Sequence, residues 1–197
     1  ESIDSINDLD IEIVPANVIN FEQVDNAIKG CDYVFHLAAL ISIMPGSKKK
    51  IFSVNVQGTK NVLKACIKNN VKRLVNTSSV HAFSEPKVGG EITEKTKFDP
   101  KETSGIYGKS KATAALEVQK AIEYGLDCVI CCPTGVIGPN DYRISEIGAL
   151  ILDYLNNDIN ICIDGEFDFV DVRDVADGEI NALYKGEKGK VYILGGT

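Results

Sequence analysis

Short apolar runs alternate with amphipathic stretches along the chain. Apolar runs of about four to eight residues bounded by turn formers indicate buried strands, and apolar residues recurring every three or four positions indicate helices. This pattern predicts strands over residues 11–14, 32–38, 72–77, 126–132, 160–163 and 190–194. It predicts helices over residues 21–29, 50–69, 106–124, 145–156 and 173–184.

Residues at the ends of the first helix support this assignment. Asn20 is a candidate N-cap, because its side chain can accept a hydrogen bond from a free backbone N–H of residues 21–29. Gly30 follows as a stop signal. By contrast, residues 80–104 are polar and contain several glycines and prolines, which predicts a long loop.

The predicted strands are nearly continuous apolar runs, which favours burial on both faces of a sheet. Strands of this kind alternating with helices are typical of a parallel sheet covered by helices on each side. The expected fold class is therefore α/β, a doubly wound parallel sheet. In such folds ligands bind at the carboxyl ends of the strands.

The composition is that of an ordinary globular protein. The 197 residues are 44% hydrophobic and 25% charged, which excludes a disordered, collagen-like or coiled-coil chain. No apolar run approaches the roughly 20 residues that span a bilayer, so no membrane partner is expected. The formal net charge of −7 argues against a nucleic-acid partner, which generally requires a basic surface.

The cysteines predict buried, inert thiols in a reducing compartment. Cys128 and Cys131 have C-x-x-C spacing, but the apolar residues around them indicate a strand in which the two side chains face opposite sides of the sheet. Since the chain has only two histidines, no metal site is expected. The six cysteines are Cys31, Cys66, Cys128, Cys131, Cys132 and Cys162.

The segment YGKSK at residues 107–111 is the central candidate for chemistry. Residues four apart share one helical face, so Tyr107 and Lys111 can point into the same cleft. Tyrosine titrates at about 10, and acid catalysis near neutral pH needs a lower pKa. A nearby ammonium supplies part of that shift. Taken alone, the pair also fits a helix with a surface lysine and a half-buried tyrosine.

Two serines follow the predicted strand of residues 72–77. Ser78 and Ser79 therefore come where an open α/β sheet places its ligands. A serine there can donate a hydrogen bond to a substrate carbonyl while Tyr107 delivers a proton. Turn formation is the alternative role for the two hydroxyls.

The ordered set of motifs resembles the extended short-chain dehydrogenase/reductase superfamily, also called NAD-dependent epimerases/dehydratases. Within it, residues 133–197 are most similar to the dihydroflavonol-reductase-like branch. The resemblance covers nearly the whole chain and implies a Rossmann-type sheet. The matching motifs are HLAA at 36–39, VNVQGTKNVLKAC at 54–66, RLVNTSS at 73–79, YGKSK at 107–111, PTGVIGP at 133–139 and FVDVRDVADG at 169–178.

The resemblance implies a role for each matching catalytic position. Ser79 aligns with the serine that polarises the substrate carbonyl, and Tyr107 aligns with the acid/base. Lys111 would bind the nicotinamide ribose and lower the pKa of the tyrosine. Asn55 matches an asparagine that in relatives supports a water-mediated proton relay or packing.

Further positions match cofactor-binding residues of the family. Asn17 stands where the family usually has an acidic residue near the adenine, and asparagine can still form hydrogen bonds there. His36, Asp171 and Asp174 are expected to be structural. The cofactor-binding set implied by the resemblance is Asn17, Val18, Leu37, Ala38, Ala39, Thr77, Tyr107, Lys111, Pro133, Thr134 and Val136.

The family's Gly-rich loop, G-x-x-G-x-x-G, is absent from the sequence. The chain opens at Glu1 without Met, so we expect a piece of a longer protein that lacks the first two strands and the end of the substrate domain. Residues 1–140 would be a partial dinucleotide-binding domain. Residues 141–197 would be a partial substrate-binding region interleaved with the last Rossmann elements. Since the residue that selects NAD or NADP would follow the second strand, either cofactor is expected.

The function implied is an NAD(P)-dependent oxidoreductase that transfers a hydride between nicotinamide and a small ketone or alcohol substrate. A sugar-nucleotide epimerase or dehydratase is the enzymatic alternative, and a non-catalytic nucleotide-sensing relative is the other. The chain as given could also be an inactive fragment. A cytoplasmic homodimer, formed through residues 50–69 and 106–124, is expected from the resemblance.

Overall fold

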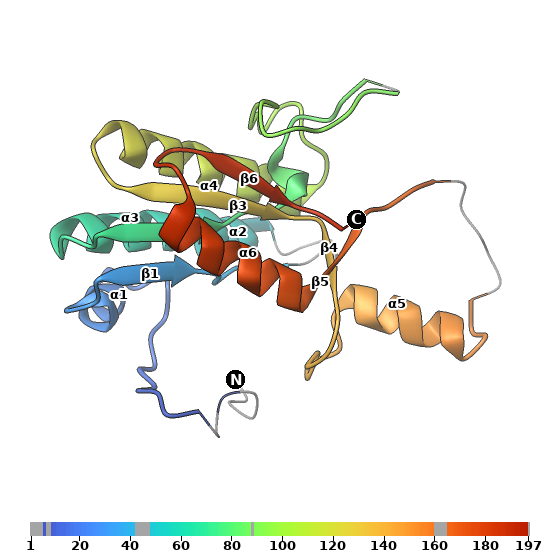
Figure 1. Cartoon of the computed structure of the whole chain (residues 1–197), viewed down its shortest axis with the longest axis horizontal. Coiled ribbons are helices and arrows are strands. Elements are labelled where there is room, and N and C mark those ends of the chain that lie inside the picture. Colours follow the sequence, from blue (N-terminus) through green and yellow to red (C-terminus); the bar gives the residue numbers. More distant parts are fainter. Residues whose placement is uncertain (1–5, 7–8, 42–47, 88, 160–164, 197) are drawn as a thin grey trace.

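The computed structural model describes residues 6, 9–41, 48–87, 89–159 and 165–196. Its centre is a four-stranded sheet in which every neighbouring pair is parallel. The strand order follows the sequence order (Figure 1). The strands are β1 (Tyr33–His36), β2 (Arg73–Thr77), β3 (Cys128–Pro133) and β6 (Val191–Leu194).

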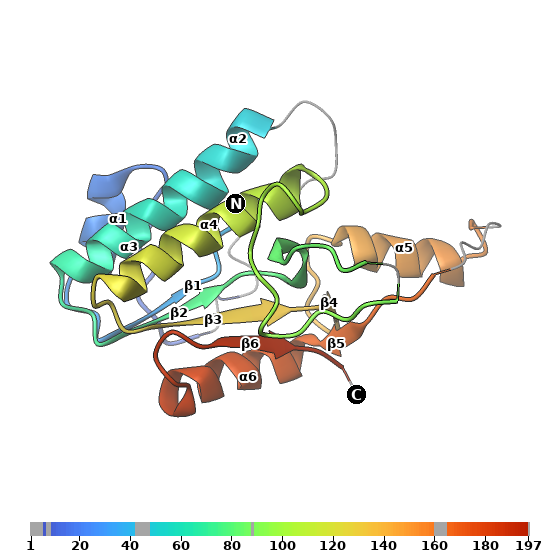
Figure 2. The same ribbon diagram turned by 90° about the horizontal axis from the view of Figure 1, so that it is seen from above.

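Helices cover the two faces of this sheet unequally (Figure 2). One face carries α1 (Phe21–Ile28), α2 (Lys48–Phe52), α3 (Thr59–Lys68) and α4 (Ile106–Glu123). The other face carries α6 (Val172–Lys185), which contacts β2, β3 and β6. The expected doubly wound α/β fold is therefore confirmed.

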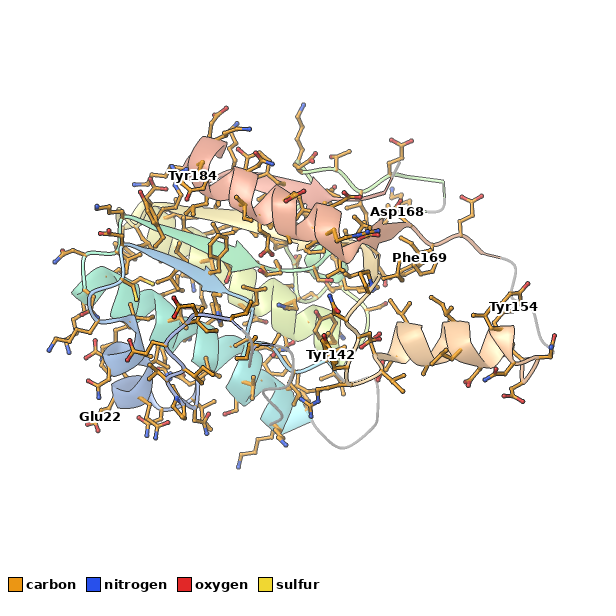
Figure 3. The ribbon with its side chains drawn as sticks, turned by 60° about the horizontal axis from the view of Figure 1, so that its bottom comes forward. Glu22, Tyr142, Tyr154, Asp168, Phe169 and Tyr184 are labelled. Carbon is orange, nitrogen blue, oxygen red and sulfur yellow. The ribbon has the colours of Figure 1, made fainter. Side chains whose placement is uncertain are left out.

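A smaller unit extends from the carboxyl end of the main sheet (Figure 1). It consists of the parallel pair β4 (Gly135–Ile137) and β5 (Phe169–Asp171), and of helix α5 (Glu146–Leu155). None of the residues of α5 is buried. Tyr154 on this helix and Tyr184 on α6 both point away from the body of the molecule (Figure 3).

The core lies in two layers, one on each side of the sheet. Successive side chains of β3 alternate between them: Cys128, Ile130 and Cys132 join the larger cluster, and Val129 and Cys131 join the cluster against α6. Cys128 and Cys131 therefore face opposite sides of the sheet, as predicted. Burial raises the pKa of the Cys131 thiol to about 12, so this group is neutral and unreactive at physiological pH.

Three predicted elements differ in the structure. The predicted helix of residues 50–69 is interrupted by a π-helical turn, η1 (Ser53–Gly58), between α2 and α3. Residues 11–14 form no strand and are exposed, because no described strand lies beside them to take their backbone hydrogen bonds. The predicted strand of residues 160–163 lies outside the described residues.

The strands of the smaller sheet were not predicted. β4 and β5 have three residues each, which is too short for an alternating pattern to show. The predicted loop of residues 80–104 contains one short turn of helix, η2 (Val80–Ala82). In the described part of the chain, no helix is both long and apolar enough to cross a bilayer.

Candidate active site

The carboxyl end of β2 brings two hydroxyls into a buried position. The backbone N–H of Ser78 donates to the carbonyl oxygen of Cys131 at 2.6 Å, which carries the β2–β3 pairing one residue beyond the strand. Ser79 then caps η2, since its side chain accepts from the N–H of His81 at 3.2 Å. Both serines are buried, so each hydroxyl is available only to groups inside the site.

Tyr107 lies in the first turn of α4 and is half-buried. Burial raises its pKa to about 12, while a hydrogen bond with the Ser79 side chain acts in the opposite direction. The structure therefore brings Tyr107 to Ser79, as the resemblance implies. The expected lowering of the tyrosine pKa by Lys111 is not found, because burial is the largest effect and Lys111 is directed elsewhere.

Gly108 allows α4 to approach the segment after Ser79. A Cβ at this position would lie 2.6 Å from the carbonyl oxygen of His81 and 2.7 Å from Cγ2 of Thr103. The absence of a side chain therefore sets how closely Tyr107 can approach the serine.

Lys111 is buried beneath the end of β2. Its Nζ donates to the carbonyl oxygen of Thr77 at 2.8 Å. Burial lowers the pKa of Lys111 to about 8. The hydroxyl of the same threonine donates to Oε1 of Glu179 at 2.6 Å.

Glu179 is the site residue that sequence reasoning missed. It is buried on α6, on the same face as Val175, Ala182 and Leu183. The sequence did contain a signal for this residue. Glu179 is an acidic residue at a position that the helical period assigns to the apolar face.

Asn55 connects the site to the loop after β1. It is buried in the π-helical turn, a feature often found at functional sites. Its Nδ2 donates to the Leu40 carbonyl oxygen at 3.1 Å and to Oγ of Ser110 at 2.9 Å, and its Oδ1 accepts from the N–H of Leu40 at 2.7 Å. Since Ser110 in turn donates to the carbonyl oxygen of Tyr107 at 2.7 Å, Asn55 positions the first turn of α4.

His36 and Asp171 have structural surroundings. His36 is buried, and its Nε2 lies 2.9 Å from Oγ1 of Thr59. Asp171 is the N-cap of α6 and accepts from the N–H of Arg173 at 2.8 Å. Neither group faces the serine and tyrosine hydroxyls in these contacts.

A second group of expected cofactor residues lies beside β1. Val18 and Ala38 line one hollow, together with His36 and apolar residues such as Ala16, and neither Tyr107 nor Lys111 contributes to its lining. The Asn17 side chain accepts from the N–H of Ile19 at 3.2 Å and so shapes a turn at its edge. Leu37 is exposed and Ala39 is half-buried.

The last three expected residues follow the end of β3. Pro133 is buried at the strand's end. The N–H of Thr134 donates to the Leu194 carbonyl oxygen at 3.0 Å, and Val136 pairs with Val170 in the smaller sheet. The expected residues thus form three groups: one beside β1, one around Tyr107 and one after β3.

A family model confirms the resemblance. The model of the NAD dependent epimerase/dehydratase family matches residues 2–195. The chain belongs to this family. The family's dependence on NAD agrees with the expected cofactor, NAD or NADP.

Two curated relatives match almost the whole chain. Sterol demethylase protein B of Methylococcus capsulatus is 32% identical over 98% of this chain and 58% of its own length. The putative dihydroflavonol 4-reductase of Synechocystis sp. is 32% identical over 98% of this chain and 57% of its own length. The chain therefore spans somewhat more than half the length of these relatives.

Solved structures show the same fold. The crystal structure of gox2253 superposes with a TM-score of 0.93 at 30% identity, covering 100% of this chain and 60% of that one. A UDP-glucose 4-epimerase of Thermus thermophilus, in complex with NAD, superposes with a TM-score of 0.77 at 25% identity, over 94% of this chain and 63% of that one. The family is named for epimerases and dehydratases, and the relatives of this chain include a putative reductase and an epimerase.

The residues around Tyr107 fit the nicotinamide end of such a cofactor. In the described part of the chain, Lys111 Nζ has one hydrogen-bond acceptor, so further N–H donors are available for ribose hydroxyls. The Ser78 hydroxyl is buried and lies beside the Cys132 thiol. The glycine loop that would hold the pyrophosphate is not in this sequence. No cluster of three or more metal-ligating side chains occurs in the described ranges.

Proposed function

We propose that the chain carries the catalytic half of an NAD(P)-dependent reductase or dehydrogenase acting on a small ketone or alcohol. The observation that carries this proposal is the convergence of Ser79, Tyr107 and Lys111 at the carboxyl end of β2. This is the position at which open α/β sheets bind their ligands.

Each side chain would have a distinct role. Bound nicotinamide would supply or accept the hydride at the substrate carbon. Ser79 would donate a hydrogen bond to the substrate oxygen, and Tyr107 would transfer a proton to that oxygen during reduction. Lys111 would hold the ribose through the N–H groups of its ammonium that do not donate to the Thr77 carbonyl oxygen.

Asn55 would act through position rather than chemistry. Its bonds to Leu40 and Ser110 hold the loop after β1 and the first turn of α4 together. The groups beside β1 and after β3 would contact the adenosine and nicotinamide ends of the cofactor.

A sugar-nucleotide epimerase or dehydratase is the second candidate, supported by the structural likeness to enzymes with those activities. Such enzymes use the same core chemistry on a nucleotide-bearing substrate. The short segment between Pro139 and Asp171 leaves little room for nucleotide recognition, which favours the reductase.

Tyr107→Phe in the full-length protein tests the proposal. We expect kcat for NAD(P)H-dependent reduction of a ketone panel to fall by about 100- to 10,000-fold, because general acid catalysis contributes that much. Tyr124→Phe is the control, since Tyr124 ends the same helix and is 87% exposed. Equal turnover in both variants would exclude Tyr107 as the acid. Nucleotide-sugar turnover with no net oxidation of added NAD(P)H would favour the epimerase.

The division at residue 140 into partial dinucleotide-binding and substrate-binding regions belongs to this proposal. So do a cytoplasmic location and a homodimer formed through residues 50–69 and 106–124, whose helices α3 and α4 lie side by side on one face of the sheet (Figure 2). The mass of the full-length protein in solution tests the dimer.

A further inference from the structure

Glu179 is a buried carboxylate that the proposed reaction does not use. It is 4% exposed and comes from α6, on the face of the sheet opposite α4. Its neighbours on the buried face of α6 are the apolar residues Val175, Ala182 and Leu183. Burying a carboxylate at such a position costs free energy unless an opposite charge or hydrogen bonds compensate for the loss of water.

Thr77 links this carboxylate to Lys111 from both sides. Its hydroxyl donates to Oε1 of Glu179 at 2.6 Å, and its carbonyl oxygen accepts from Lys111 Nζ at 2.8 Å. Two buried ionisable groups from helices on opposite faces of the sheet therefore meet at one residue, at the end of β2. The hydrogen bond to Glu179 also fixes the threonine side chain.

The other titratable groups near Lys111 carry no negative charge at neutral pH. Burial raises the pKa of Cys132 and that of Cys131 to about 12, so both thiols are neutral. Burial lowers the pKa of His36 to about 4, so its imidazole is neutral too. Tyr107, with its pKa raised to about 12 by burial, is a neutral phenol. Among the described residues, this leaves Glu179 as the acidic group whose charge acts on Lys111.

The two charges oppose the effect of burial on each other. Burial raises the pKa of Glu179, whereas the Thr77 hydrogen bond and the charge of Lys111 lower it. Burial lowers the pKa of Lys111, whereas negative charge on Cys132 and on Glu179 raises it; since the Cys132 thiol is neutral, the carboxylate of Glu179 is the charge that acts. Each group thus favours the ionised form of the other.

We propose that Glu179 is a positioning residue that acts through Thr77 and Lys111, as the buried counter-ion that keeps the lysine protonated. Any effect of Glu179 on the chemistry of Tyr107 rests on the proposed function, whereas its effect on the protonation of Lys111 is independent of that function. A protonated lysine is the form that keeps N–H groups for ribose hydroxyls beside the one that donates to the Thr77 carbonyl oxygen.

Glu179→Gln is the direct test, because glutamine keeps an acceptor for the Thr77 hydroxyl and removes the charge. In the full-length protein with isotope-labelled lysine, the NMR signal of Lys111, assigned by Lys111→Arg, gives its titration midpoint. We expect that midpoint to fall by about one pH unit in Glu179→Gln, the usual effect of losing one close opposite charge. Asp177→Asn, which removes an exposed carboxylate from the same helix, should leave the midpoint unchanged.

An unchanged midpoint in a folded Glu179→Gln protein would overturn the proposal. If that variant fails to fold, the ionisation state of Glu179 in the wild-type protein tests the proposal instead. A carboxyl carbon shift showing Glu179 ionised at pH 7 supports the counter-ion, and one showing it protonated overturns it.

Enzyme kinetics separate this inference from the proposed function. If the enzyme turns over, the alkaline limb of kcat/KM should move to lower pH in Glu179→Gln, because activity is lost where Lys111 loses its proton. An absence of turnover in the wild-type protein would contradict the proposed function alone, since the lysine titration needs no substrate or cofactor.

Discussion

His36 couples protonation to stability at the scale of a single residue. The Thr59 hydroxyl donates to the Asn55 carbonyl oxygen at 2.7 Å, so Nε2 of the neutral imidazole donates to Thr59. Burial, with a smaller contribution from the charge of Lys111, lowers the pKa of His36 from 6.5 to about 4. The unfolded chain therefore takes up a proton between these values, and the folded chain does not.

The free energy of unfolding should fall as the pH drops from 6.5 to 4. The unfolded state binds more protons than the folded state in this window, so a lower pH favours unfolding. His36 accounts for up to about 3 kcal/mol of the change in the free energy of unfolding. Urea unfolding of the wild-type protein and of His36→Gln at several pH values measures it. The variant should show a slope shallower by about 1.4 kcal/mol per pH unit. Parallel slopes would show that His36 is protonated in the fold.

Several residue-scale features were predictable from the sequence. Tyr107 and Ser79 meet as expected, because strand ends and helix starts converge on one edge of a parallel sheet. The raised pKa of Tyr107 was not predictable, since it depends on how much protein surrounds the ring. The Glu179 contact was equally hidden, because it joins residues 102 positions apart.

Arg73 joins three elements at the opposite end of the sheet. Its guanidinium forms two hydrogen bonds with Asp127, at 2.9 and 3.0 Å. Its Nη1 also donates to the carbonyl oxygens of Leu183 and Gly186, at 2.9 and 2.7 Å, where α6 ends. One planar side chain therefore ties β2 to the segment before β3 and to the carboxyl end of α6.

Arg73→Lys should lower the free energy of unfolding by about 2 kcal/mol, because an ammonium cannot reproduce this fork and leaves carbonyl oxygens unpaired. The neighbouring Lys72→Met is the matched control. Lys72 pairs with Asp32 at 3.0 Å, but both side chains are more than 60% exposed, and such pairs contribute little. Chemical denaturation of both variants measures the difference, and equal stability would contradict the role of Arg73.

At the scale of elements, the helix caps and the apolar periods of the helices were the most predictable features. Asn20 accepts from the N–H of Gln23 and begins α1, as its position indicated. The π-helical turn around Asn55 was not predictable, because a change of period confined to six residues is too short to show in the apolar pattern. The strands β4 and β5 exist only through their mutual pairing, which no local pattern encodes.

The whole molecule has one apolar face that the described residues leave uncovered. α6 contacts the other three strands of the main sheet, and Tyr33, Phe35 and Leu37, in and just after β1, are exposed. Ile11 and Ile13, in the segment before α1, are exposed as well. Exposed apolar strands at the edge of a sheet favour association.

The chain of 197 residues, expressed alone, should therefore self-associate. Phe35→Lys should reduce the association, since a lysine on an edge strand opposes pairing. Sedimentation velocity over roughly 5 to 100 µM, the range in which such surfaces aggregate, measures it. A monomer at every concentration would contradict the prediction, and a variant that associates as strongly as the wild type would place the contact elsewhere.

The contact between Thr77 and Glu179 also determines when the site can be completed during synthesis on the ribosome. The chain emerges from its amino-terminal end, so β2 and α4 leave the ribosome well before α6. Glu179 follows Thr77 by 102 residues. A nascent chain that has exposed everything through β3 carries Tyr107, Lys111 and both serines, but not the carboxylate. The charge balance of this site is therefore completed only after α6 has been synthesised.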